Sequence, residues 1–142
     1  MAENLLGSTK DTVIQDQVEM NFKGETNETG LYLAMARQAE GYGYPEVAAA
    51  LSKIAWEEAL HAARFAELNG KISPSLKENL ERMLSGEIGA CSGKYDAAKK
   101  CKEIAIDCAH DFFHESSRDE NRHAGILRGL LQRYFIKQEN KK

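Results

Sequence analysis

The sequence predicts an all-α fold, a bundle of four helices, on three observations. Apolar residues recur at steps of three and four residues, the period of a helix, along four stretches of the 142-residue chain. The two prolines, Pro45 and Pro74, each lie in a short break that is rich in glycine or polar residues. No stretch alternates apolar and polar residues for long enough to make a strand. We expect one domain over residues 1–142, with amphipathic helices at about 11–40, 45–69, 75–100 and 104–136.

The first two helices are the best bounded. In the first, the apolar series runs from Ile14 through Val18 and Phe22, and the helix ends before the GYGYP break at 41–45. The second begins at Pro45, a residue favoured in the first turn of a helix, and ends before the NGKISP break at 69–74.

The third and fourth helices are distinguished less sharply. The third carries Leu76, Leu80 and Met83 on its apolar side, and the fourth carries Phe113 and Leu127. No glycine or proline lies between them, so their boundary is placed near 100–104 on periodicity alone.

Composition excludes several classes of protein. A net charge of -3 and a pI near 5.8, with basic residues interleaved among acids, do not suit a nucleic-acid surface. No apolar run approaches the ~20 residues of a membrane span, and the N-terminus shows no secretory signal. The three cysteines contain no CxxC pair and are expected to be reduced, which favours a cytoplasmic location.

Six acidic and imidazole side chains interrupt the apolar stripes of the four helices. A carboxylate in the core of a bundle costs several kcal/mol unless another group compensates its charge. The interruptions are Glu25 on the first helix, Glu58 and His61 on the second, Glu87 on the third, and Glu120 and His123 on the fourth.

The spacing of these residues shows an internal repeat. The step along the chain from Glu25 to Glu58 equals the step from Glu87 to Glu120. Each pair begins with Gly-Glu and ends in an acidic residue leading Glu-x-x-His, so the chain reads as two copies of one helical hairpin. Because residues i and i+3 share one face of a helix, each Glu-x-x-His can reach one metal ion.

This repeat predicts a two-metal site inside the bundle, the arrangement of di-iron carboxylate proteins. Carboxylates and imidazoles without thiolates suit iron or manganese, and zinc can take their place in a purified sample. The alternative is a set of buried polar residues without metal, and a single Glu-x-x-His is also common as a surface pair.

These residues resemble the di-iron domain of the rubrerythrins, over about residues 15–136. The segments NFKGETNETGLYLAMAR, WEEALHAARFAELNG and HDFFHESSRDENRH are most similar to the reverse rubrerythrins. The resemblance implies a ferritin-like four-helix bundle with two iron ions per site. The rubredoxin module of that family needs four cysteines, and this chain has three, so we expect no built-in electron donor.

The resemblance also assigns a seventh ligand, with one departure. The family has a second glutamate three residues after the first on the third helix, where this chain has Ala90. The equivalent position on the first helix is Glu28, which we expect to be the displaced ligand; the alternative is a solvated charge.

Four residues are expected around the ligands. Tyr32 and Tyr95 match tyrosines of the family that bond the ligand carboxylates, although packing would also explain them. Glu57 and Asp119, each four residues before a ligand histidine, are candidates to orient the imidazoles, with a surface position as the alternative. His110 and His114 fall outside the site.

By resemblance, the expected activity is that of a peroxidase of oxidative-stress defence, which reduces hydrogen peroxide with electrons from a separate rubredoxin-like protein. An oxygen-reactive di-iron oxidase and an iron-binding or storage protein without turnover are the alternatives. No side chain beyond the metal ligands is expected to act in catalysis.

The connection between the second and third helices predicts a dimer. In a ferritin-like bundle it must cross ~35 Å, from the helical rise, whereas residues 70–74 reach at most ~17 Å when extended. Either the bundle is a plain up-down-up-down type, or two chains exchange hairpins. We expect the exchanged homodimer, in which Glu25, Glu28, Glu58 and His61 of one chain meet Glu87, Glu120 and His123 of the other.

Overall fold

The computed structural model describes residues 5–136, and within them it is all-α. No strand occurs in that range, which agrees with the predicted fold class. None of its helices is both long and apolar enough to span a membrane. The elements are α1 (Gln15–Gly41), α2 (Pro45–Leu68), α3 (Leu76–Glu103), α4 (Asp107–Leu131) and a final π-helical turn, η2 (Gln132–Ile136).

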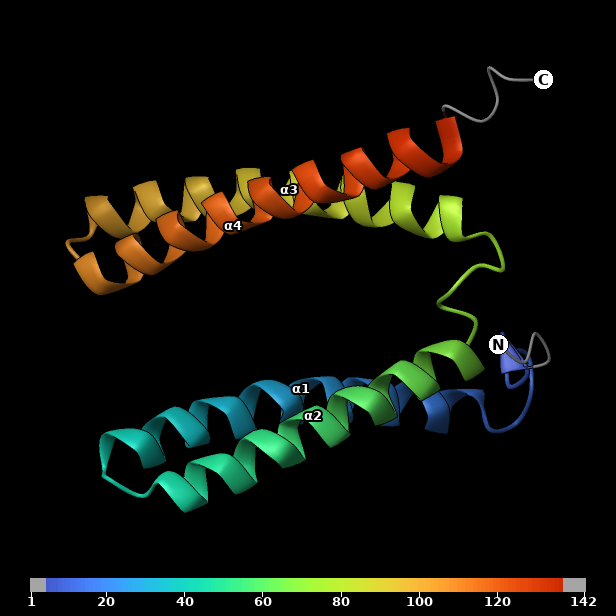
Figure 1. The fold of residues 1–142 in the computed structure, drawn as a ribbon, viewed down its shortest axis with the longest axis horizontal. Helices are drawn as coiled ribbons and strands as arrows, with labels where there is room; N and C mark the ends of the chain where they lie inside the picture. The colour runs from blue at the N-terminus through green and yellow to red at the C-terminus, as the bar shows by residue number, and fades with distance from the viewer. Residues whose placement is uncertain (1–4, 137–142) are drawn as a thin grey trace. The chain divides into compact units, whose positions relative to one another are not determined.

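The chain divides into two compact units, each built on a helical hairpin. In one unit, residues 1–74, α1 packs along α2, and in the other, residues 75–142, α3 packs along α4 (Figure 1). Shifting the first hairpin along the sequence until Glu25 falls on Glu87 moves α1 onto 77–103 and α2 onto 107–130. Those ranges are almost the bounds of α3 and α4. The internal repeat read from the ligand spacing therefore extends to the whole length of the helices.

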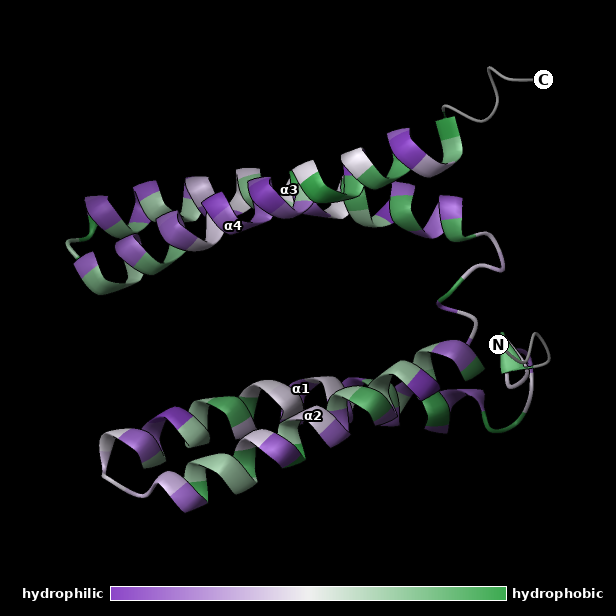
Figure 2. Ribbon diagram, in the orientation of Figure 1, coloured by the Kyte–Doolittle hydropathy of each residue, from purple (hydrophilic) through white to green (hydrophobic). Residues whose placement is uncertain are grey.

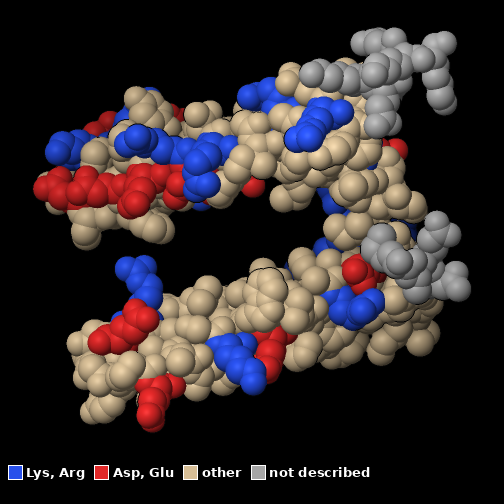
Figure 3. Space-filling model, viewed as in Figure 1, with Lys and Arg blue, Asp and Glu red and all other residues tan. Residues whose placement is uncertain are grey.

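Small residues at equivalent positions form the interface inside each hairpin. Ala36 and Ala62 are buried in the first hairpin, and their equivalents Ala98 and Ala124 are buried in the second. Methyl-sized side chains let two helices approach closely, and many of the large apolar residues stay exposed, although Val18 and Leu131 are buried. Hydrophobic residues alternate with hydrophilic ones along all four helices in Figure 2. On the face drawn in Figure 3, acidic side chains of the α3–α4 hairpin form a band beside a band of basic ones.

α1 begins four residues later than expected because the segment before it folds back on the end of α2. The amide of Gly7 donates to the carbonyl of Glu67 at 2.8 Å, and the Thr9 hydroxyl donates to the carbonyl of Leu68 at 2.8 Å. The last carbonyls of a helix lack partners within it. Residues 5–14 thus cap α2 instead of extending α1.

The end of α2 is also tied to α1 through Lys71. The Lys71 amide donates to the carbonyl of Ala66 at 2.9 Å, which closes the last turn. Its ammonium lies 2.8 Å from Glu19 and 4.8 Å from the centre of the Phe22 ring. Only residues 72–75 then remain before α3, whose first turn is capped by the Ser75 hydroxyl accepting from the Glu78 amide at 3.3 Å.

The two hairpin turns are equivalent in position but differ in sequence, including at the residue with positive φ. Gly43 between α1 and α2 has φ of 79°, and Ala105, its equivalent in the repeat, has φ of 57° between α3 and α4. An alanine therefore occupies a left-handed position that glycine normally fills. The break at residues 104–106 has neither glycine nor proline, which is why α3 runs three residues past its expected end.

Candidate metal centre

The first hairpin brings Glu25 of α1 together with Glu58 and His61 of α2, a group that we call half-site 1. One ligand atom from each residue lies within 4.8 Å of the others. His61 Nδ1 is 3.0 Å from Glu58 Oε2 and 3.6 Å from Glu25 Oε2. The i,i+3 spacing in α2 puts Glu58 and His61 on one face, and the packing of the hairpin sets Glu25 opposite them.

The second hairpin repeats this geometry with Glu87 of α3 and Glu120 and His123 of α4, which form half-site 2. Their ligand atoms also lie within 4.8 Å of one another. His123 Nδ1 is 3.3 Å from Glu120 Oε2 and 3.5 Å from Glu87 Oε2. The structure thus gathers six of the seven predicted ligands in two equivalent groups of three.

The carboxylates of both half-sites are more enclosed than the imidazoles. Glu25 and Glu58 expose 20% and 18% of their side chains, whereas His61 exposes 60%. Beside each half-site is a shallow hollow at equivalent positions, lined in part by Arg64 and Phe65 in one hairpin and by Ile126 and Leu127 in the other.

In half-site 1 the close carboxylates perturb one another. A hydrogen bond with Glu58 raises the pKa of Glu25, and burial and the charge of Glu58 add to the rise. The same hydrogen bond, with that from His61, lowers the pKa of Glu58. The bond to Glu58 also raises the pKa of His61. Hydrogen bonds through shared protons therefore offset the repulsion between the Glu25 and Glu58 carboxylates.

In half-site 2 the two carboxylates shift one another's pKa in the same way, and Lys94 adds a positive charge beside Glu120. A hydrogen bond with Glu120 raises the pKa of Glu87. The bond from Glu87, followed by that from Lys94, lowers the pKa of Glu120 to about 2.

This donor set fits a pair of divalent metal ions. Each half-site offers two carboxylates and one imidazole, with no thiolate, which suits iron or manganese. Two carboxylates in contact need either a proton or a cation between them, and a metal ion can replace the shared proton. The coordinating groups of each half-site converge from two helices, as a site in a helical bundle requires.

Glu28, the predicted seventh ligand, lies on the exposed side of α1 near half-site 1. Its charge contributes to the raised pKa of Glu25, so the two carboxylates are neighbours. The equivalent position in α3 is Ala90, which leaves half-site 2 without a counterpart.

The two predicted tyrosines lie in different surroundings. Tyr32 is half-buried on α1. Tyr95 is exposed, with its ring 6.5 Å from that of His114 and its centre 4.5 Å below the Lys99 ammonium. His114 in turn stacks on His110 at 6.0 Å, outside both half-sites, as expected from their positions on α4.

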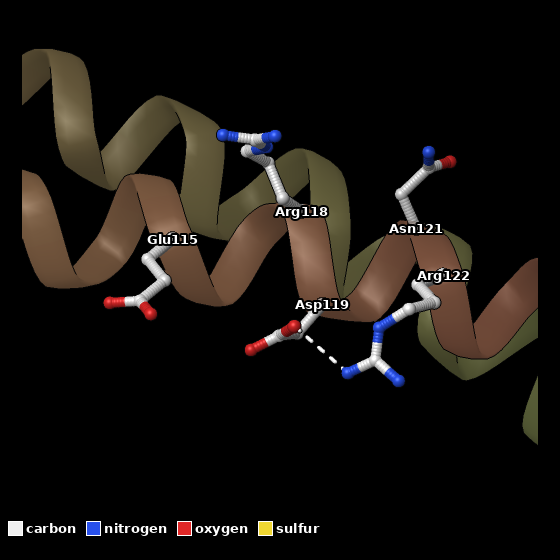
Figure 4. Close-up of a pocket in the computed structure, with 5 residues that line it drawn as sticks. All are labelled: Glu115, Arg118, Asp119, Asn121 and Arg122. Atoms are coloured by element: carbon white, nitrogen blue, oxygen red, sulfur yellow. Dashed lines mark hydrogen bonds and ion pairs between the residues drawn. The ribbon is translucent and has the colours of Figure 1, made fainter.

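Glu57 and Asp119 form ion pairs along the exposed sides of their own helices. Glu57 pairs with Lys53 at 3.9 Å, and Asp119 pairs with Arg122 at 2.9 Å. Figure 4 shows Asp119 pointing to Arg122 over the α4 surface, together with Glu115, Arg118 and Asn121 around a surface pocket. These contacts correspond to the surface alternative for both acids.

Sequence reasoning missed Lys94. Its ammonium contacts the Glu120 carboxylate and donates to the Ser116 hydroxyl at 2.7 Å. The repeat holds a signal that could have found it, because the step from Glu87 to Lys94 equals the step from Glu25 to Tyr32. Lys94 therefore occupies the position of the repeat that is equivalent to Tyr32.

Comparison with known proteins agrees with this geometry. The rubrerythrin family model matches residues 16–131. The chain is 47% identical to Reverse rubrerythrin-1 of Clostridium acetobutylicum over 136 residues, which cover 94% of this chain and 75% of that protein. It is 60% identical to an uncharacterized protein of Methanocaldococcus jannaschii over 133 residues, 94% of each chain. With four helices and two Glu-Glu-His groups in register, the chain belongs to the rubrerythrin family of ferritin-like di-iron proteins.

Proposed function

We propose that the protein is a di-iron peroxidase that reduces hydrogen peroxide to water. The observation that carries this proposal is the pair of equivalent half-sites, each with two carboxylates and one imidazole at contact distance. Two ferrous ions held there would supply two electrons, which with two protons convert one peroxide molecule into two of water.

The side chains of this chain would hold the metals and handle protons. Glu58 and His61, like Glu120 and His123, present their ligand atoms from one helix face. Because the pKa of Glu25 and the pKa of Glu87 are raised, each hairpin has a carboxyl group able to keep a proton beside a second carboxylate. Metal binding would displace these protons to solvent, because carboxylates and imidazoles coordinate a metal ion in their deprotonated forms.

The electrons would come from a separate rubredoxin-like protein. These 142 residues contain three cysteines, all free, whereas a four-thiolate iron site needs one more. Free thiols suit a reducing cytoplasm, where we propose the protein works.

Anaerobic stopped-flow mixing tests the activity. The di-ferrous protein should be oxidised by peroxide at least tenfold faster than by oxygen at equal concentration. A double variant, His61→Ala with His123→Ala, is the control for iron bound elsewhere and should show neither reaction. Equal or faster oxidation by oxygen contradicts the proposal, and turnover of an organic substrate would then identify an oxidase. Hundreds of irons per assembly would identify a storage protein.

We further propose that the complete site forms between two chains that exchange hairpins. Glu58 lies about three helical turns before the end of α2, and Glu87 lies about three turns after the start of α3. In a ferritin-like arrangement those helix ends are ~32 Å apart along the axis. Lys71 is held on α1, so within one chain only the segment from Lys71 to Leu76 could make this crossing. That segment spans at most ~18 Å and is too short.

Mixing two single variants tests the exchange. In a swapped dimer of one His61→Ala chain and one His123→Ala chain, both substitutions meet in one site and the other site is intact. Co-refolding the two should restore iron binding in about half of the sites of the mixed dimer. If each chain builds its own site, mixing restores none. A monomer in light scattering that still binds two irons also refutes the exchange.

A further inference from the structure

Lys94 introduces a positive charge into half-site 2. Its ammonium contacts Glu120 and donates to Ser116 at 2.7 Å, and its side chain is only 33% exposed. Lys99, further along α3, is 59% exposed and reaches Asp96 at 3.3 Å. Lys94 is thus anchored against a ligand, whereas Lys99 is an ordinary surface lysine.

The equivalent positions of half-site 1 carry no such charge. Tyr32 occupies the place of Lys94, and Glu28 occupies the place of Ala90. With all groups ionised, Glu25, Glu58 and the neighbouring Glu28 bring three negative charges to half-site 1. Glu87 and Glu120 bring two to half-site 2, where Lys94 cancels one. The net charge of these residues therefore differs by two units between half-sites that are alike in geometry.

A cation already bound to a ligand carboxylate competes with a metal ion for it. The Lys94 ammonium occupies one oxygen of Glu120, and the other oxygen faces His123. A divalent ion entering half-site 2 must displace the ammonium or accept its repulsion at short range. Within the described residues no lysine or arginine is seen on a ligand carboxylate of half-site 1, and Arg64, which lines the adjacent hollow, is paired with Glu67 at 2.9 Å.

We infer that Lys94 takes the place of the metal ion in the metal-free half-site 2, so that half-site 2 binds its metal more weakly and later than half-site 1. This inference rests on the metal binding in the proposed function and not on the peroxide chemistry. An exposed ion pair without this role contributes little, and removing it would leave metal affinity unchanged.

Anaerobic titration of the full-length, metal-free protein with Fe²⁺ and with Co²⁺ tests the inference. Calorimetry and Co²⁺ absorption should resolve two binding events whose affinities differ at least tenfold. His61→Ala should remove the tight event, and His123→Ala should remove the weak one.

Lys94→Met should strengthen the weak event at least tenfold while lowering the Tm of the metal-free protein, since Glu120 loses its counter-charge. A lysine that only packs would lower the Tm without raising affinity. Lys99→Met is the matched control and should change neither. If Lys94→Met does not fold, Lys94→Gln, which keeps a donor for Glu120, should show the same gain.

Transferring the charge supplies the converse test. Tyr32→Lys should weaken the tight event at least tenfold. Two equal events in the natural protein, or a weak event that Lys94→Met leaves unchanged, overturn the inference. Because no peroxide is used, unequal binding in a protein that fails to reduce peroxide defeats only the proposed function. Equal binding in an active peroxidase defeats only the role of Lys94.

Discussion

His61 Nδ1 lies 3.0 Å from Glu58 Oε2, one helical turn away on the same face of α2. The contact raises the pKa of His61, because the carboxylate favours the protonated imidazole. A metal ion needs the same imidazole without its proton. A rise in pH should therefore weaken the His61–Glu58 contact of metal-free half-site 1 and strengthen metal binding there.

The first prediction concerns this pH dependence. The histidine is protonated in the unfolded chain below about pH 6.5. In the metal-free protein the His61–Glu58 pair stabilises the fold fully below that pH, and its contribution is lost as pH rises through the raised folded pKa. Metal affinity should rise over the same window. Melting curves from about pH 5.5 to 8.5 should show a metal-induced gain in Tm that widens with pH.

His61→Gln isolates this effect, because it keeps a polar side chain without a proton equilibrium in that range. The increase of the metal-induced gain in Tm with pH should be smaller in the variant than in the natural protein. A metal-induced gain that shrinks as pH rises would contradict the assignment of His61 as a ligand.

The second prediction concerns the number of bound metals. His61→Ala removes the only imidazole of half-site 1, so metal content should fall from two ions per site to about one. His114→Ala is the matched control, since His114 stacks on His110 away from both half-sites. Metal analysis after gel filtration measures both. Unchanged metal content in His61→Ala would show that half-site 1 does not bind a metal ion through His61.

The third prediction concerns Glu28. If it is the seventh ligand, Glu28→Gln should lower the affinity of half-site 1 by tenfold or more, about 1.4 kcal/mol. Glu57→Gln is the control, because Glu57 is exposed and paired with Lys53. Calorimetric titration with Co²⁺ measures the change. Equal, small effects of the two substitutions would make Glu28 a solvated charge.

The fourth prediction concerns the two hairpin turns. Ala105 holds φ of 57°, a conformation that costs an L-residue roughly 1–2 kcal/mol. Ala105→Gly should therefore stabilise the protein by about 1 kcal/mol. Gly43→Ala, at the equivalent turn with φ of 79°, should destabilise it by a similar amount. Urea unfolding of the metal-free protein measures both. Stabilisation by Gly43→Ala would be the contrary result.

The helix period made the half-sites predictable from sequence. Once Glu58 and His61 lie on a helix, their spacing puts them on one face, and the repeat puts Glu120 and His123 in the same relation. The structure brings these residues together as the spacing indicates. The match to the rubrerythrin family confirms the resemblance read from the segments around them.

Features that depend on contacts distant in sequence were not predictable in this way. α1 starts late because Gly7 and Thr9 bond the end of α2, which lies a whole hairpin further along the chain. The turn between α3 and α4 was obscure because Ala105 replaces the usual glycine. Lys94 was overlooked because a lysine on an amphipathic helix is normally solvated, and only its contact with Glu120 shows otherwise.

The internal repeat means that the two hairpins share nearly the same helix bounds and their Glu and Glu-x-x-His positions, while most of the residues around those positions differ. A chain carrying Glu28→Ala and Lys94→Tyr would have matching residues at both of these equivalent positions. Such a protein would measure how much of a difference in metal affinity between the half-sites comes from these two positions. Each metal position can therefore be adjusted by substitution in its own hairpin, without redesign of the other.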